Sequence, residues 1–138
     1  CPYTVKHYAT GNMQALQQEA TGKGVVWLTV ASSAPGKQGH VTAAQANKLS
    51  TERKAVPTAV LLDHDGKIGR LYDARTTPHM FIVDQKGALV YQGAIDNDPS
   101  GANSDRVNYV AKALDEVLAG QSVSEPETRA YGCSVKYK

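Results

Sequence analysis

The stretch PHMFIVDQKGALVY, residues 78–91, decides the fold. Two apolar runs in it, residues 78–84 and 88–91, are separated by the turn residues Gln85-Lys86-Gly87. Short runs rich in β-branched and aromatic residues on either side of a glycine-containing turn are typical of a β-hairpin. We therefore expect two adjacent antiparallel strands here, with Pro78 at the start of the first.

Upstream of the hairpin, strands alternate with helices. The run Val25–Ala31 is apolar on both faces apart from one threonine, which predicts a strand covered by helices on both sides and a parallel sheet. Residues 57–66 predict a second short strand that ends in a turn. Between the two strands, Thr42 and Gln45 form a capping box that opens a helix. The apolar spacing in residues 68–72 predicts another short helix.

Helices are also predicted at both ends of the chain. One starts at Cys1-Pro2, because proline is favoured at the first helical position. Gly11 then interrupts the pattern, and we expect Asn12 to cap a second helical stretch, residues 13–20. The last helix has the clearest apolar stripe, and we expect it to be capped by Ser104 and to end at Gly120. The stripe consists of Val107, Val110, Ala111, Leu114, Val117 and Leu118.

This order of elements predicts an α/β domain. It resembles the thioredoxin-like fold, a three-layer sandwich with parallel strands and a C-terminal antiparallel hairpin. In that fold a central strand leads directly into the active-site helix. Nothing precedes Cys1, so we expect the first central strand to be absent from this chain. The strand edges left without it predict a rearranged sheet, strand exchange between subunits, or low stability. We assign residues 1–120 to the domain, truncated at its N-terminus, and residues 121–138 to a tail that carries Cys133.

The composition excludes several classes of protein. Hydrophobic residues make up 41% and charged residues 20% of the 138 residues, which is ordinary for a globular domain. The net charge is +2 and the basic residues are scattered, which argues against nucleic-acid binding. The longest apolar runs are too short to span a membrane. No targeting segment is present, so a bacterial periplasm and a cytoplasm both remain open.

The chain contains two cysteines, Cys1 and Cys133. Two are too few for a disulfide scaffold, and Thr4 stands where a Cys-x-x-Cys pair would have its second thiol. Three interpretations remain open: a reactive pair, a structural bridge, or two unrelated free cysteines. Reactivity is favoured for Cys1, because unpaired N–H groups at a helix N-terminus stabilise a thiolate and lower the thiol pKa from its usual value of about 8.5.

Three motifs in order resemble those of a known family: Cys1-Pro2 at a helix start, Thr77-Pro78 before an apolar strand, and the Asp84-x-x-Gly87 turn. They are similar to the redoxin group, the alkyl hydroperoxide reductase/thiol-specific antioxidant proteins and their thioredoxin-like relatives. The resemblance extends from Cys1 to about Gly120. It implies that Cys1 is the nucleophile and that Pro78 is a cis-proline facing it. It also implies that Thr77 offers backbone groups to an extended substrate or partner, and that Cys133 is the resolving thiol.

The expected activity is that of a thiol-dependent oxidoreductase or peroxidase. Its substrate would be a peroxide or a protein or small-molecule disulfide, and an external thiol would act as reductant. No cofactor and no metal are expected, and a homodimer is allowed. Two alternatives stay open. One is a non-catalytic thioredoxin-fold binding module; the other is a metal carrier in which His7 and His79 lie near Cys1.

Overall fold

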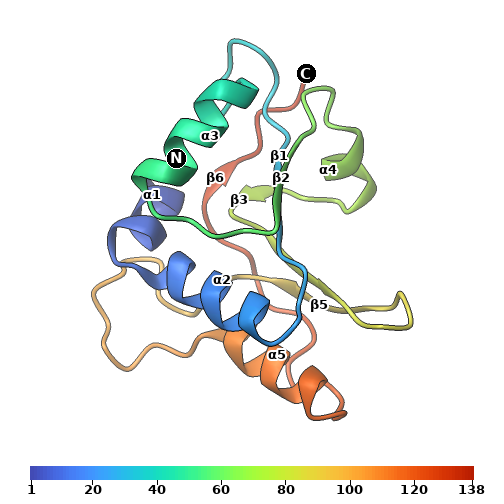
Figure 1. Ribbon diagram of the computed structural model, residues 1–138. Helices are drawn as coiled ribbons and strands as arrows, with labels where there is room; N and C mark the ends of the chain where they lie inside the picture. The colour runs from blue at the N-terminus through green and yellow to red at the C-terminus, as the bar shows by residue number, and fades with distance from the viewer.

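The computed structural model describes all residues from Cys1 to Lys138. The chain contains five helices and six short strands, as expected for an α/β protein (Figure 1). In chain order they are α1 (Pro2–Ala9), α2 (Asn12–Gly22), β1 (Leu28–Ala31), α3 (Ala43–Glu52), β2 (Ala59–Leu62), α4 (Lys67–Leu71), β3 (Thr76–Thr77), β4 (Met80–Val83), β5 (Leu89–Gly93), α5 (Tyr109–Leu118) and β6 (Cys133–Ser134).

The six strands form three separate pairs instead of one sheet. The predicted parallel pair is β1 with β2, in register from Leu28↔Ala59 to Ala31↔Leu62. The predicted hairpin is β4 with β5, and its first strand begins at Met80 rather than at Pro78. The third pair, β3 with β6, is antiparallel. No strand in residues 1–138 joins β1 to β4, so each of them has a strand partner on one edge only.

The strand predicted at 25–31 is shorter than expected and is not covered on both faces. Regular pairing begins only at Leu28. Val26 is 66% exposed and Leu28 is 51% exposed, whereas Trp27, which points the other way, is 9% exposed. The even-numbered face therefore lacks a covering layer, and the prediction of a strand buried on both sides is wrong.

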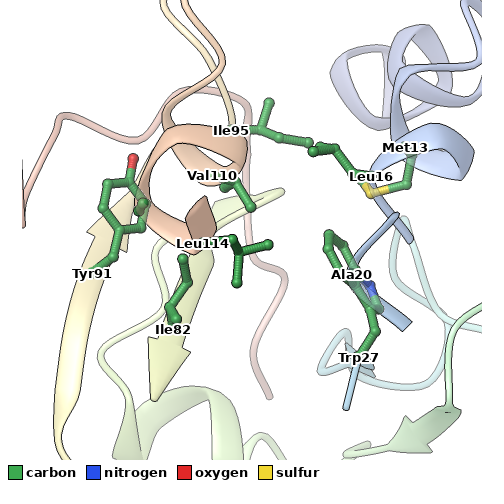
Figure 2. Packing of buried hydrophobic residues seen from close by; sticks show 10 residues of the cluster. Met13, Leu16, Ala20, Trp27, Ile82, Tyr91, Ile95, Val110 and Leu114 are labelled. Atoms are coloured by element: carbon green, nitrogen blue, oxygen red, sulfur yellow. The ribbon is translucent and has the colours of Figure 1, made fainter. Parts of the chain in front are cut away.

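The hydrophobic core lies between the hairpin and two helices. In Figure 2, Ile82 and Tyr91 of the hairpin approach Val110 and Leu114 of α5. Residues of α2 and Trp27 extend the same cluster. Its ten members are Met13, Leu16, Ala20, Trp27, Ile82, Tyr91, Ile95, Val110, Ala113 and Leu114. Through Ile82, this core holds β4, the strand that follows Thr77-Pro78.

Two of the predicted helix caps need correction. Helix α2 starts one residue early: Gly11, at φ 78°, is its N-cap, and Asn12 lies within the helix, where its side chain contacts His7 instead. Helix α5 starts late, because the Asn108 side chain rather than that of Ser104 accepts the backbone N–H of the first turn. The capping box at the start of α3 is present as predicted.

The tail after α5 is docked along its length. It first contacts α5, where the Ser124 hydroxyl donates to the Glu116 carboxylate (3.1 Å), and then β5, where the Gln92 N–H donates to the Pro126 carbonyl (3.0 Å). It then supplies β6, and its end is held where the Tyr137 hydroxyl donates to the Ala74 carbonyl (2.6 Å). In Figure 1 the tail runs from the end of α5 past β3 to the opposite end of the molecule. This path brings Cys133 into the domain.

Candidate redox site at Cys1, Thr77 and Cys133

Three segments that are distant in the sequence meet at Thr77. The thiol of Cys1, the N-cap residue of α1, donates a hydrogen bond to the Thr77 carbonyl oxygen (3.3 Å). Cys133 pairs with Thr77 in the antiparallel β3–β6 ladder. Residues directly opposite each other in such a ladder have Cα atoms about 4.5–5.5 Å apart. The two cysteines are therefore both neighbours of Thr77; both are free thiols and partly exposed.

The segment around Thr77 is held by its own short-range contacts. The Thr77–Pro78 peptide bond is cis, as the resemblance implied. The Thr76 hydroxyl donates to the Pro78 carbonyl (2.8 Å). His79 Nδ1 accepts the Arg75 N–H (3.1 Å), and the His79 ring stacks on Phe81. The Thr77 carbonyl is thus presented to Cys1 from a fixed turn.

Gly132 allows the tail to approach this turn. Its φ is 141°, a conformation that side chains rarely adopt, and a Cβ built on it would lie 2.2 Å from the Thr77 carbonyl oxygen. That distance is far shorter than any normal contact between these atoms. The β3–β6 pairing, and with it the position of Cys133, therefore requires glycine at 132.

A buried polar cluster ties the tail to the helix that begins at Cys1. Its centre is the Tyr131 hydroxyl, two residues before Cys133. This hydroxyl donates to the Asp96 carboxylate and lies 3.1 Å from His7 Nε2. His7 and Asp96 are only 1% and 2% exposed. The other nitrogen of His7 contacts the Asn12 amide (3.0 Å). Each member thus has a partner, as buried polar groups require.

The electrostatics of the cluster keep its groups in defined protonation states. Burial lowers the pKa of His7, while the Asp96 carboxylate acts in the opposite direction. Burial raises the pKa of the Tyr131 hydroxyl, and the hydrogen bond to Asp96 adds to the effect. Near neutral pH, His7 is therefore uncharged and Tyr131 keeps its proton. Within the cluster, the Tyr131 hydroxyl donates to the Asp96 carboxylate, which also pairs with the Arg106 guanidinium (3.7 Å), and these contacts hold the tail.

An open groove lies beside the site but contains neither thiol. It has a volume of about 630 Å³. Its lining includes Thr76 and Gly132, which adjoin the site, together with Asp96, Arg129 and Tyr131. Since no cysteine reaches it, the groove gives no reason to place a substrate there.

Other residues with metal-binding or charged side chains do not converge on Cys1. No three of the histidine, cysteine and acidic side chains are close enough together to hold a metal ion. Lys6 donates to the carbonyl oxygens of Asp98 and Pro99 (2.9 and 2.8 Å), and Arg75 pairs with Asp73 (2.8 Å). No helix combines the length and the hydropathy that crossing a membrane requires.

Sequence reasoning missed most of the polar cluster. Asp96 and Tyr131 belong to no motif, although Tyr131 lies two residues before Cys133. No periodicity or spacing links residues 7, 96 and 131, so only the fold reveals that they meet. The two cysteines and Thr77, in contrast, were all singled out from the sequence, and the structure brings them together.

The model of the Redoxin family matches residues 1–111. The chain belongs to the Redoxin family. It therefore comes from a family of thiol-dependent redox proteins, which includes thiol peroxidases and oxidoreductases. The match ends before Cys133, so the tail lies outside it.

Two solved structures share the fold over the whole chain. One is an uncharacterized conserved protein from Geobacillus kaustophilus, with a TM-score of 0.87 and 26% identity; the match covers 100% of this chain and 72% of the other. The second is a hypothetical protein from Sinorhizobium meliloti 1021, with a TM-score of 0.85 and 23% identity, covering 100% and 74%. No curated protein matches the chain. The predicted thioredoxin-like fold is confirmed by these findings.

Proposed function

We propose that this Redoxin-family protein is a two-cysteine oxidoreductase in which Cys1 attacks the oxidant and Cys133 resolves the product. One observation carries the proposal: both cysteines border Thr77, Cys1 through its thiol and Cys133 through strand pairing. If the two cysteines were unrelated, nothing would require both of them to lie beside the same residue. A reactive pair requires that convergence.

The first step takes place at Cys1. Its sulfur lies at the N-terminus of α1, where the first-turn N–H groups stabilise negative charge. The hydrogen bond to the Thr77 carbonyl holds the thiol until it loses its proton. With a hydroperoxide, the thiolate attacks the terminal hydroxyl oxygen, an S–O bond forms and the O–O bond breaks. Sulfur becomes a sulfenic acid, and the leaving alkoxide or hydroxide takes up a proton.

The second step joins the two cysteines. The Cys133 thiolate attacks the Cys1 sulfenic sulfur, an S–S bond forms, and hydroxide leaves and is protonated to water. An external dithiol then reduces the disulfide by two exchange steps and returns both thiols. With a disulfide as oxidant, Cys1 would form a mixed disulfide and Cys133 would release the substrate as thiol.

Serine substitutions test the two roles separately. Cys1→Ser is expected to abolish reduction of hydrogen peroxide, because no nucleophile remains. Cys133→Ser is expected to react once and stop, with the sulfenic acid on residue 1 captured by dimedone and found by mass spectrometry. The wild type, oxidised without reductant, should instead carry a Cys1–Cys133 disulfide.

Two outcomes would refute the assignment. One is steady turnover by Cys1→Ser. The other is a Cys1 that reacts with iodoacetamide at mildly acidic pH no faster than free glutathione, which would show that its thiol is not activated and that a binding role is the better explanation.

A further inference from the structure

We infer that the tail takes the place of an extended partner strand beside Cys1, and that the oxidant this protein accepts is therefore a small molecule rather than a protein disulfide. The inference rests on the proposed function of Cys1 as the attacking thiol. It narrows the substrate class that the two cysteines alone leave open.

The backbone edge of β3 next to Cys1 is already paired with the tail. Strand β3 has two residues, and both are paired with the tail, Thr76 with Ser134 and Thr77 with Cys133. A polypeptide that docks in extended form needs a free strand edge to hydrogen-bond to. While β6 is in place, the edge of β3 that faces the tail is not open to such a polypeptide.

The tail also covers the chain on the N-terminal side of β3. The Val135 N–H donates to the Arg75 carbonyl (3.0 Å), and the Tyr137 hydroxyl donates to the Ala74 carbonyl (2.6 Å). From residue 74 to residue 77, each position thus contacts the tail. A partner protein would have to displace several contacts at once, and not only the two-residue strand.

Cys133 stands where the cysteine of such a partner would stand. It faces Thr77, the residue whose carbonyl accepts the Cys1 thiol. The tail therefore supplies its own thiol at this position, and an incoming protein cysteine would compete with it. A small oxidant needs only access to the sulfur of Cys1, which is partly exposed.

Two chromogenic disulfides with the same reacting bond test the inference. One is N-acetylcysteine amide joined to 2-nitro-5-thiobenzoate; the other is an extended decapeptide with the same group on its central cysteine. Cys1 attacks the cysteine sulfur, a new S–S bond forms as the old one breaks, and the coloured thiolate leaves with the electron pair. The measurements are made in Cys133→Ser, so that Cys1 is the only thiol.

We expect the decapeptide to react more slowly than the small disulfide by about tenfold or more. Gly132→Ala in the same background should raise the decapeptide rate and leave the rate of the small disulfide unchanged, because its Cβ collides with Thr77 and weakens the β3–β6 pairing. The matched control is Gly120→Ala, a glycine at φ 74° whose added Cβ would touch nothing. Circular dichroism shows whether each variant folds.

The outcomes separate the two proposals. Equal rates for both disulfides in Cys133→Ser would overturn the inference about the tail while the role of Cys1 stands. An absence of colour release from either disulfide by the folded protein would instead overturn the proposed function. If Gly132→Ala does not fold, the inference is tested by the ratio of the rates for the small disulfide and the decapeptide in Cys133→Ser alone.

Discussion

Cys1 and Cys133 are neighbours of the same threonine, but different kinds of contact hold them there. Cys1 is fixed by the helix that it begins, since its carbonyl accepts the Val5 N–H (3.0 Å). Cys133 lies in a strand of two residues. Its position depends on contacts made by its neighbours in the tail, Tyr131 with Asp96 and Gly132 with Thr77.

Cys1 is thus held by local contacts within its own helix, whereas Cys133 is held by contacts between residues that are distant in the sequence. A strand of two residues does not hold itself, because isolated strand pairs are at best marginally stable. The resolving half of the site should therefore be weakened by changes far from Cys133 in the sequence. The reactivity of Cys1 should be unaffected by most of these changes. Three predictions test this contrast: a substitution of Tyr131, a change of pH and a substitution of Arg75.

The largest effect is expected from Tyr131→Phe. The ring, which packs edge-on against Tyr3, is kept, while the Asp96 carboxylate and His7 Nε2 each lose a buried partner. We expect the free energy of unfolding to fall by about 1–3 kcal/mol. Formation of the Cys1–Cys133 disulfide should slow, whereas the first reaction of Cys1 with peroxide should keep its rate. Urea denaturation and stopped-flow kinetics measure the two effects.

Tyr3→Phe is the matched control, because Tyr3 is 39% exposed and lies outside the buried hydrogen bonds of Tyr131 with His7 and Asp96. It should leave stability and both rates unchanged. An equal loss of peroxide reactivity and disulfide formation in Tyr131→Phe would contradict the separation of the two anchors.

The same contrast explains how much of the site was predictable from the sequence. Pro2 after Cys1, and the Pro-led apolar run that follows Thr77, are local signals, and they predicted the helix start and the hairpin. Local signals failed at two helix caps. The Asn12 side chain contacts His7 and Asn108 instead of capping α2, and α5 begins after Asn108, four residues beyond the expected cap Ser104. The long-range contact of Tyr131 with Asp96 leaves no local trace in the sequence.

The sheet shows the same limit. The apolar run at 25–31 predicted a strand with both faces buried, but burial depends on which elements lie beside the strand in space. Val26 and Leu28 are exposed because no layer covers that face. The run therefore correctly predicted a strand and its parallel pairing, but not its surroundings. A homodimer, as allowed by the sequence, stays a prediction.

A smaller effect is expected from lowering the pH. Burial depresses the pKa of His7 below its ordinary value of 6.5, so the folded chain binds this proton less readily than the unfolded chain. The free energy of unfolding is therefore highest at pH values above 6.5, where His7 is neutral in both states. It decreases as the pH falls below 6.5, because the unfolded chain then takes up the proton more readily than the folded chain. Urea denaturation between pH 7.5 and pH 5, in buffers of about constant ionic strength, measures the decline.

His79 needs a separate control, since burial lowers its pKa as well. His7→Gln should flatten the pH dependence more than His79→Gln does, because His7 is the more deeply buried of the two. A pH dependence that His7→Gln leaves unchanged would show that the Tyr131 cluster does not respond to protons in this range.

The smallest effect is expected from Arg75→Gln. The Arg75 guanidinium pairs with Asp73, and both side chains are exposed, 76% and 74%. Exposed ion pairs contribute little to stability, so neither the free energy of unfolding nor the peroxide rate of Cys1 should change measurably. The Arg75 carbonyl, which accepts the Val135 N–H, belongs to the backbone and survives the substitution. Disulfide formation should therefore also be normal. A slower reaction of Cys1 in this variant would mean that the guanidinium acts on the thiolate, and the attacking cysteine would then depend on a long-range contact just as the resolving one does.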